Sequence, residues 1–563
     1  MVTGRNRPGV AHHRGLCCRI SGRHSYERAE MQVKFQRAIQ LAICSIVLSS
    51  GASTGLAQYR ESPFAELPPI SLSSPVPITN HHIDDRRNYV TPVGHSSYEE
   101  SQSWELSTGS PSVGNSAVSM LLDEEERHSG SNQSYEQRLQ ALEQAWQDQK
   151  AAAEKKKGPT SGKPTLKING RIHADHWSFA DDSQGIHFFE NPLTGVDPED
   201  RFFFRRIRLK FEGEIVDNMI YRMQIDFNSP SSGEMKDMYI GWDDLPVLGR
   251  LLVGNQKRPL GLDHLNSSRF NIFMERPLVV EAFNEDARRF GIASYTVSDD
   301  ERYNLRYGAY ALENMVRNGE IIGDSRQWGV NARLASSPWY DEYSGGRNYF
   351  HWAIAGMAAR PDGDVDRNDT NFNDGRFRTR GELRSRRRWI DTGRIAGAQW
   401  YEILAFESIL NVGPFQVVGE YQSNWMQRDK TTARTGPDLH FHGGYIYAAY
   451  MLTGEHVPYK RKSGTIDRVT PFQNFFLVDC GDGIASGWGA WQVALRYSYL
   501  DLTDNDVQGG IEENVTLGLV WYFNANSSLQ FNAVWGDIRD HRPVGGFTGG
   551  DFTALGTRLR INF

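Results

Sequence analysis

The amino-acid sequence predicts an all-β protein: a 16-stranded antiparallel transmembrane β-barrel preceded by a short helical, coiled-coil-like segment. Three observations support this fold class. Apolar and polar residues alternate with a period of two from about residue 165 to the last residue. Short turns and long segments alternate between the expected strands. The last expected strand ends on an aromatic residue, Phe563.

Composition excludes several other classes. The formal net charge of −7 and the isoelectric point of about 6.2 argue against a nucleic-acid-binding protein. The mean hydropathy is −0.55, and no run of about 18 apolar residues follows the N-terminal region, so a helical membrane span is not expected. Strands of a membrane barrel are only half apolar and are compatible with these values.

Residues 1–57 are expected to form a Sec-type signal peptide region whose start is Met31 or Met1. Lys34 and Arg37 supply the positive charge, residues 38–48 the apolar core, and small residues precede Gln58. A buried helix is the alternative. Only Cys480 follows this region, so stability is expected to depend on hydrogen-bonded strands and not on an internal disulfide.

Two segments are expected between the signal peptide and the barrel. Residues 58–130 are rich in Pro, Ser, Gly and Asn without a sustained period, which predicts a disordered tether. Residues 131–157 predict a short coiled coil, because heptad spacing relates Tyr135, Leu139, Leu142 and Trp146. A single amphipathic helix packed on the body is the alternative. The barrel is then expected to occupy residues 164–563.

Period-two alternation predicts sixteen strands, near residues 165–178, 201–215, 219–228, 235–243, 249–258, 288–297, 302–312, 326–335, 349–359, 398–411, 415–427, 440–452, 488–502, 513–523, 527–536 and 553–563. Residues 216–218 and 411–414 are typical short turns, whereas residues 361–396 and 453–487 are long connections. A membrane barrel has short turns at one end and long outer loops at the other. We therefore expect the long segments to be outer loops.

The second strand illustrates the question that function depends on. Residues 206–215 read RIRLKFEGEI, which places Arg206, Arg208 and Lys210 on one face and apolar residues on the other. In a soluble sandwich the charged face would meet water and the apolar face a core. In a membrane barrel the apolar face meets lipid and the charges line the lumen. The loop pattern and the last strand favour the second interpretation.

The last strand has the same character. Leu555, Leu559, Ile561 and Phe563 share one face, and Arg558, Arg560 and Asn562 share the other. A terminal Phe on such a strand resembles the signal recognised by the outer-membrane barrel assembly machinery. Four tryptophans on the apolar phase of their strands suggest an interfacial girdle, although strand propensity alone is an alternative: Trp242, Trp328, Trp521 and Trp535.

Between the fifth and sixth strands the chain reads VGNQKRPLGLDHLNSSRFNIFMERPLVVEAFNEDARRFGI. This stretch resembles the phosphate-selective porin O and P family. The resemblance continues through IDTG at 390–393, GPFQVVGEY at 413–421, LTGEHVPY at 452–459, GAWQVALRYSYLDL at 489–502 and WYFN at 521–524. It covers roughly residues 165–563 in order. Gln492 departs from the family pattern, where we expect Glu.

The resemblance implies a trimeric barrel in the cell outer membrane whose third loop folds into the lumen and constricts it. Family pores use arginines of the second strand, a third-loop series and an acidic residue at the narrow point. Together with the charged face of the second strand, this gives the candidate anion-binding, pore-lining residues Arg205, Arg206, Arg208, Lys210, Asp237, Lys257, Arg258, Ser267, Ser268, Arg269 and Arg276.

These residue types suit anion conduction. Guanidinium groups can replace the hydration of an oxyanion by charge-assisted, often bidentate hydrogen bonds. Several weak sites suit conduction better than one deep site, because an ion must leave as well as enter. For each lumen arginine, an ion pair with an acidic residue across the barrel is the alternative. A salt bridge from Asp237 to Lys236 or a nearby arginine is also possible.

The sequence therefore predicts passive, anion-favouring diffusion of phosphate, polyphosphate or similar anions, with no catalytic residues, metal or cofactor. Other predicted partners are outer-membrane lipid, the barrel assembly machinery and two further copies of the chain. The arginine-rich segment 376–388 is interpreted as an outer anion funnel, a site for lipopolysaccharide phosphate, or a set of paired loop charges. Alternative functions are a general-diffusion or structural envelope porin, and a secreted glycan-binding protein or hydrolase using Glu402 and Glu407.

Overall fold

The computed structural model describes residue 144 and residues 163–228, 233–285, 287–315, 321–323, 327–363, 373–429, 436–479 and 484–563. The expected signal peptide and tether, and all but one residue of the expected coiled coil, lie outside the described residues. In the ranges that are described, no helix has the length and apolarity needed to cross a membrane.

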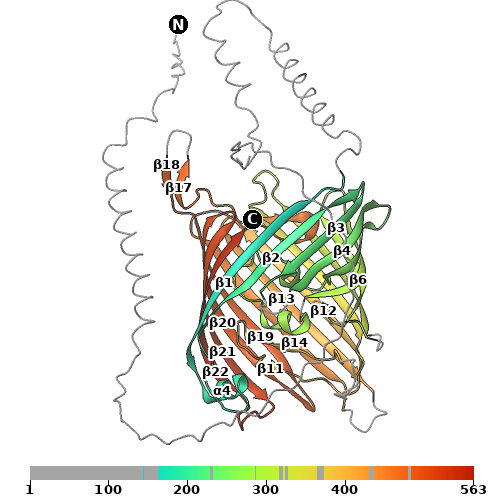
Figure 1. The fold of residues 1–563 in the computed structure, drawn as a ribbon, viewed down its shortest axis with the longest axis vertical. Helices are drawn as coiled ribbons and strands as arrows, with labels where there is room; N and C mark the ends of the chain where they lie inside the picture. Colours follow the sequence, from blue (N-terminus) through green and yellow to red (C-terminus); the bar gives the residue numbers. More distant parts are fainter. Residues whose placement is uncertain are drawn as a thin grey trace, which may run out of the picture. The chain divides into compact units, whose positions relative to one another are not determined.

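Sixteen antiparallel strands form a closed barrel in which each strand pairs with its neighbours along the chain, and β1 pairs with β22 to close the sheet (Figure 1). The expected number of strands is confirmed, and every expected range overlaps its strand. The barrel strands are β1 (Lys167–Asp182), β2 (Arg201–Val216), β3 (Met219–Asp226), β4 (Glu234–Leu245), β5 (Gly249–Lys257), β6 (Arg288–Val297), β7 (Tyr303–Ala311), β8 (Trp328–Tyr340), β9 (Asn348–Arg360), β12 (Ala398–Val412), β13 (Phe415–Arg428), β14 (Leu439–Met451), β19 (Ala490–Asp504), β20 (Val507–Asn524), β21 (Ser527–His541) and β22 (Gly550–Asn562).

The period-two pattern becomes an inward and an outward face. In β22, Leu555 and Leu559 are 48% and 42% exposed on the outer face, whereas Arg558 and Arg560 are each 2% exposed inside the barrel. Outside, the apolar side chains take the positions that lipid would contact. Trp328 and Trp535, two of the four expected girdle residues, are also exposed on the outer face.

Small elements occupy the connections. The helices are α4 (Gln184–Glu190), α5 (Leu262–Leu265), α6 (Leu278–Phe283) and the 3-10 turn η1 (Arg461–Ser463). Three two-stranded sheets pair β10 (Arg378–Thr379) with β11 (Ile390–Asp391), β15 (Tyr459–Lys460) with β16 (Thr465–Ile466), and β17 (Phe476–Asp479) with β18 (Ile484–Gly487).

The two ends of the barrel differ, as expected. One end, here called the loop end, carries residues 183–200, 258–287 and 361–397, together with other connections. The opposite turn end carries very short links such as residues 217–218 and 413–414. The chain therefore leaves the turn end at its C-terminus, close to the start of β1.

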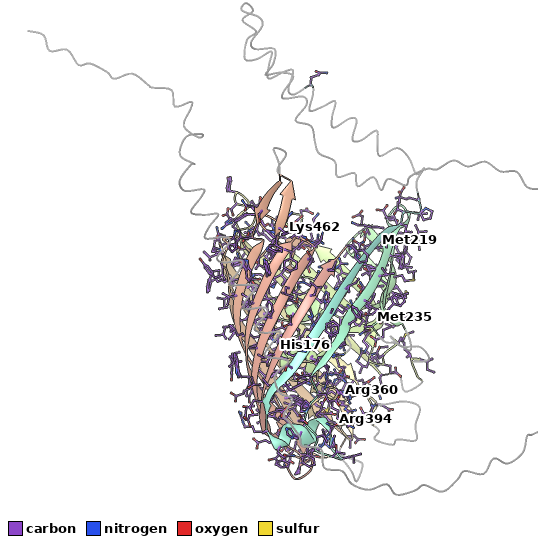
Figure 2. The ribbon with its side chains drawn as sticks, turned by 60° about the vertical axis from the view of Figure 1, so that its left-hand side comes forward. His176, Met219, Met235, Arg360, Arg394 and Lys462 are labelled. Atoms are coloured by element: carbon purple, nitrogen blue, oxygen red, sulfur yellow. The ribbon has the colours of Figure 1, made fainter. Side chains whose placement is uncertain are left out.

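One expected outer loop is at the wrong end. Residues 452–489 follow β14, the twelfth barrel strand, and connections after even-numbered strands lie at the turn end. Figure 2 shows Lys462 of this segment toward the same end as Met219, and away from Arg360 and Arg394. The prediction that residues 453–487 form an outer loop is therefore wrong, because length alone does not give the side on which a connection lies.

The barrel closes on its last residue. The Phe563 N–H donates to the Gly170 carbonyl at 3.1 Å, and the Gly170 N–H donates to the Phe563 carbonyl at 2.8 Å. A Cβ atom built on Gly170 would overlap the Phe563 ring. The absence of a side chain on Gly170 therefore provides the space in which the terminal aromatic ring packs.

We predict that Gly170→Ala weakens the closure between β1 and β22, because the added methyl group must displace the Phe563 ring. The free energy of unfolding should fall by about 1 kcal/mol, the low end of the usual cost of overpacking, because the Phe563 ring is 58% exposed and can shift. The measurement is the temperature at which the folded band converts to the unfolded band in gel electrophoresis. Gly356→Ala is the control, since a Cβ atom built on Gly356 would lie 3.9 Å from the Ile403 carbonyl oxygen, an ordinary van der Waals contact. Equal conversion temperatures for the two variants would contradict the prediction.

Candidate functional site

The connection between β5 and β6, residues 258–287 and here called the constriction loop, folds into the barrel. Its helix α6 contacts β14 and β19 on the inner wall. The Phe273 ring lies edge-on to Tyr447 with centroids 5.6 Å apart, and it packs against Gly518. Met274 and Trp177 both pack against Gly556, which has no side chain. The apolar side of the loop is therefore buried against one half of the wall.

A carboxylate on the inner wall fastens the start of this loop. Glu420 Oε2 accepts hydrogen bonds from the N–H groups of Leu262 at 3.0 Å and Asp263 at 3.2 Å, and from Tyr445 Oη at 3.2 Å. These N–H groups belong to the first residues of α5, which have no partner within the helix. The wall therefore supplies the acceptor that the short helix lacks.

A second carboxylate joins two loops to the wall. Glu382 lies in residues 361–397, here called the mouth loop, and its Oε1 accepts from the Leu278 N–H at 3.3 Å. Its Oε2 accepts from Arg496 Nε at 3.1 Å and from Thr516 Oγ1 at 2.8 Å. Glu382 therefore holds the constriction loop, the mouth loop and strands β19 and β20 together.

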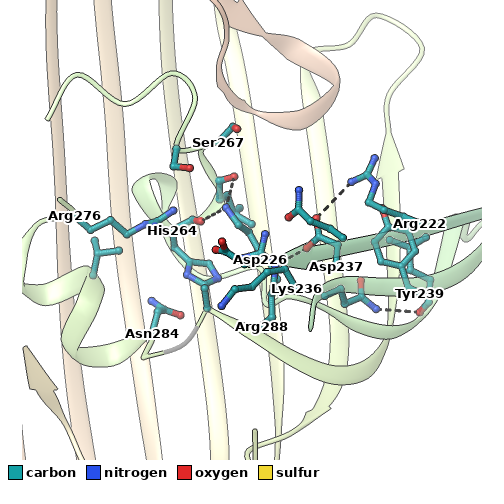
Figure 3. A pocket seen from close by; sticks show the side chains of 18 of the residues that line it. Arg222, Asp226, Lys236, Asp237, Tyr239, His264, Ser267, Arg276, Asn284 and Arg288 are labelled. Atoms are coloured by element: carbon teal, nitrogen blue, oxygen red, sulfur yellow. Dashed lines mark hydrogen bonds and ion pairs between the residues drawn. The ribbon is translucent and has the colours of Figure 1, made fainter. Parts of the chain in front are cut away.

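The space that remains is a cavity of about 2190 Å³ on the side of the barrel formed by β2 to β6 (Figure 3). Among the described residues, twenty arginines and lysines line it, against twelve aspartates and glutamates. Such an excess of one sign in a narrow, low-dielectric space concentrates ions of the other sign.

Ten of the eleven sequence-predicted site residues line this cavity: Arg205, Arg206, Arg208, Lys210, Asp237, Lys257, Ser267, Ser268, Arg269 and Arg276. The exception is Arg258. Its side chain is buried, with Nη1 3.8 Å from the sulfur of Met357. Arg258 therefore lies outside the lining of this cavity, and its role in the pore stays a prediction.

A β-bulge explains why two consecutive arginines face the cavity. In strict alternation, Arg205 would point outward when Arg206 points inward. The register between β1 and β2 shifts at this point, so that His173 pairs with Arg206 and Ala174 pairs with Phe204. Arg205 is the extra residue, and its side chain reaches the lumen beside that of Arg206.

Several of these cations are neutralised. Arg205 Nε lies 2.8 Å from Glu275, and Arg208 Nε lies 2.5 Å from Asp226. Burial alone would raise the pKa of Glu275, but Arg205 and Arg558 lower it well below its usual value. For these arginines, the alternative that the sequence left open is the one observed. The remaining pairs among the predicted residues are Lys210 with Glu212, Arg276 with Asp263, and Asp237 with Arg288 and Arg222.

Seven cavity-lining cations form no ion pair with another residue in the described part of the chain: Arg171, Arg206, Lys257, Arg269, Arg306, Arg384 and Lys460. Arg171 Nη1 donates to Ser268 Oγ at 2.7 Å, and Arg269 Nη2 donates to the Gly170 carbonyl at 3.2 Å. These contacts orient the guanidinium groups without neutralising them. The net positive charge of the lumen therefore resides largely on these residues.

Lys257 has a structural task as well as a charge. Its Nζ donates to the carbonyls of His264 at 2.6 Å, Leu265 at 3.1 Å and Asn266 at 2.9 Å. An ammonium group has three N–H donors, and all three are used here. Lys257 therefore holds the turn of the constriction loop that precedes Ser267.

The arginines of the mouth loop are mostly paired with acidic residues, which was one of the three interpretations left open. Arg376 Nε lies 2.8 Å from Asp391, and Arg380 Nη1 lies 3.1 Å from Glu281. Arg378 and Arg388 both contact Glu285, at 2.6 and 2.8 Å. Among the described residues of this segment, Arg384 and Arg387 form no ion pair, and Arg384 lines the cavity.

Sequence reasoning missed several cations of the lumen, including Arg171, Arg222, Arg288 and Arg306. Arg171 and Arg222 each lie within a strand that the sequence predicted, so an inward phase assigned to every strand would have found them. The proposed hydrolase pair is separated by the wall. Glu407 is buried and contacts Arg333, whereas Glu402 contacts Gln427 on the other phase of β12.

The barrel residues match a known protein family. Residues 166–563 match the family model described as "Phosphate-selective porin O and P". An uncharacterized protein of Caulobacter vibrioides is 26% identical over 414 residues, which are 72% of this chain and 75% of the relative.

Solved structures of similar proteins include an anion-selective porin from Comamonas acidovorans, with 11% identity and a TM-score of 0.41 over 71% of this chain and 99% of that one. Another is the outer membrane channel DcaP of Acinetobacter baumannii, with 10% identity and a TM-score of 0.39 over 71% of this chain and 97% of that one. The trimer form of OmpT from Vibrio cholerae shows 9% identity and a TM-score of 0.41, over 71% and 99%.

Asp374 of the mouth loop makes the cavity charge sensitive to pH. Burial raises the pKa of this carboxyl to about 6, in opposition to the lowering effect of Arg289 and Arg394. An acid with a raised pKa becomes neutral as the pH falls through that value. The cavity therefore loses one negative charge between pH 7 and pH 5.

We predict that preference for anions increases as the pH falls from 7 to 5, and that Asp374→Asn shows the low-pH preference already at pH 7. Reversal potentials in a potassium chloride gradient, measured at both pH values, test this. Asp537→Asn, which changes a carboxylate that is 58% exposed, is the control. A variant that keeps the full pH effect of the wild type would contradict the assignment.

Proposed function

The chain belongs to the phosphate-selective porin O and P family, and on this premise we propose that it conducts phosphate and related oxyanions passively across the outer membrane. One observation carries the proposal: seven cations line the described cavity without an acidic partner. An anion entering the lumen can neutralise these charges, whereas a cation would be repelled by them.

The arrangement of the unpaired cations suits passage better than storage. One contact between unit charges at 4 Å is worth about 4 kcal/mol at an effective dielectric constant of 20. A pore that offered several such contacts at one point would hold an anion too tightly. Acidic residues between the cations, such as Asp226 and Asp237, limit the depth of each site, and successive weaker sites permit release.

Ser267 and Ser268 add neutral hydrogen-bonding capacity next to Arg269. Hydroxyl groups can both donate and accept, so they can contact either a bare oxygen or a protonated oxygen of phosphate. We propose that this segment of the constriction loop, together with Arg171 and Arg206, contacts the permeating anion.

The same proposal covers assembly and export. We infer a homotrimer, reached after export by a Sec-type signal peptide and insertion by the barrel assembly machinery through the strand that ends in Phe563. The support is the family resemblance and the outward apolar face of β22. Outer-membrane lipid would then contact the exposed side chains of the wall.

A second candidate function is general anion diffusion without preference for phosphate. Twelve of the twenty basic residues in the cavity are already paired with carboxylates, which favours a weaker and less specific field. Polyphosphate is a further candidate, because the unpaired cations come from several separate elements, including Arg171 of β1 and Arg384 of the mouth loop.

The test is the conductance of the purified protein in planar bilayers in potassium chloride, with phosphate titrated in. Phosphate that binds in the lumen should reduce the chloride current in a saturable manner. A chloride current that does not change with phosphate would favour general diffusion. Preference for potassium would contradict both candidates.

We predict that Arg269→Ala and Arg206→Ala each weaken the phosphate block by about tenfold, the effect expected for loss of a hydrogen bond to a charged group. Arg539→Ala is the matched control, because Arg539 is exposed on the outer face and pairs with Glu513. Heat-modifiable migration in gels confirms that each variant is folded. Equal block in all variants would place the binding residues elsewhere.

A further inference from the structure

A segment from the turn end enters the lumen and approaches the constriction loop. Residues 455–468, here called the luminal strap, include β15, η1 and β16 and lie within the connection between β14 and β19. Val457, Tyr459 and Ile466 are buried, although they belong to a connection and not to the wall. Lys460, Lys462 and Ser463 line the same cavity as the constriction loop.

The inner wall holds the strap through a chain of buried polar groups. Tyr459 Oη lies 2.7 Å from His351 Nδ1, and His351 Nε2 lies 2.9 Å from Glu407 Oε1. Arg333 pairs with Glu407 and donates from Nη2 to the Gly464 carbonyl at 2.9 Å. His351 and Arg333 therefore contact the strap directly, and Glu407 contacts both of these residues.

Three further hydrogen bonds and one ring contact fix the strap along its length. Tyr349 Oη donates to the Val457 carbonyl at 2.9 Å, and its ring stacks on Tyr459 with centroids 5.0 Å apart. Asn304 Nδ2 donates to the Lys462 carbonyl at 2.6 Å, and Arg306 Nη2 donates to the Ser463 carbonyl at 2.5 Å. The strap is thus bound to β7, β8 and β9.

The strap contacts the constriction loop directly. The Ile466 N–H donates to Asn266 Oδ1 at 3.2 Å, and both residues are buried. The Asn266 carbonyl in turn accepts from Lys257 Nζ at 2.9 Å and from Arg276 Nη2 at 3.5 Å. Asn266 immediately precedes Ser267 and Ser268. The hydrogen bond from Ile466 therefore ends at the position from which the lumen-facing hydroxyl groups begin.

We propose that the luminal strap is a positioning element for the constriction loop, and that Asn266 and Tyr459 set the aperture through which anions pass. The strap acts from the turn end on a loop that enters from the loop end. The width of the aperture is a property of the barrel that chloride conductance reports. The effect on phosphate, in contrast, rests on the proposed function.

The strap can be loosened without breaking the barrel. Arg333 of β8 and Glu407 of β12 pair with each other across β9, so detachment of the strap leaves neither charge buried without a partner. Tyr459→Phe removes only the hydroxyl bound to His351 and keeps the ring that stacks on Tyr349. Asn266→Ala removes the acceptor of the Ile466 N–H and leaves the main-chain carbonyl in place.

The experiment compares single-channel recordings of the wild type, Asn266→Ala, Tyr459→Phe and the double variant in potassium chloride, with and without phosphate. Tyr421→Phe, a change on the exposed outer face, is the control. We expect both single variants to increase the chloride conductance and the open-channel noise. The phosphate block should weaken three- to tenfold, the loss expected for one neutral hydrogen bond. The double variant should show less than the product of the two single effects, because both changes interrupt one connection.

Normal conductance and noise in both variants would overturn the proposal. A change in Tyr459→Phe without a change in Asn266→Ala would also overturn it, since the strap would then obstruct the lumen by itself and not position the loop. Asn266→Ser, which keeps an oxygen acceptor, should restore part of the wild-type noise. Absence of phosphate block in the wild type would refute the proposed anion, and the chloride conductance and noise would still test the strap.

Discussion

The rest of the lumen depends on the hydrogen bonds and ion pairs that buried carboxylates accept inside the barrel. An unpaired charge away from water costs several kcal/mol, so each buried carboxylate must find donors. Glu420 takes two N–H groups of the constriction loop, Glu382 joins that loop and the mouth loop to Arg496, and Glu407 with Arg333 supports the luminal strap. The inward loops are therefore held by electrostatic requirements of the wall itself.

This fastening also decides where the open space lies. The constriction loop buries Phe273 and Met274 against β20 and β22, so it occupies the lumen beside these strands. The remaining cavity faces β2 to β6, where charged side chains are concentrated. Because the anchoring carboxylates use only part of the available cations, an excess of positive charge remains on the open side. The same pairing that stabilises the loops thus leaves the cations that can act on a permeating anion.

The sequence predicted the strands well because a period of two is a local property, and both faces of each strand can be read from neighbouring residues. Two features depended on contacts between residues far apart in the chain. The bulge that turns Arg205 inward is set by the register with His173 on another strand. The pairing of Arg205 with Glu275 joins residues far apart in the chain, so no local pattern reveals it. The strap was placed at the wrong end, although counting the expected strands before residue 453 gives an even number and hence the turn end.

The most direct test of this account is the reversal potential of the wild-type protein in a bilayer that separates concentrated from dilute potassium chloride. The unpaired cations Arg171, Arg206, Arg269 and Arg306 lead us to expect a potential with the sign of chloride permeation, one that declines as salt screens the lumen. A potential with the sign of potassium permeation would contradict the central claim that buried carboxylates fasten the loops and leave the lumen positive.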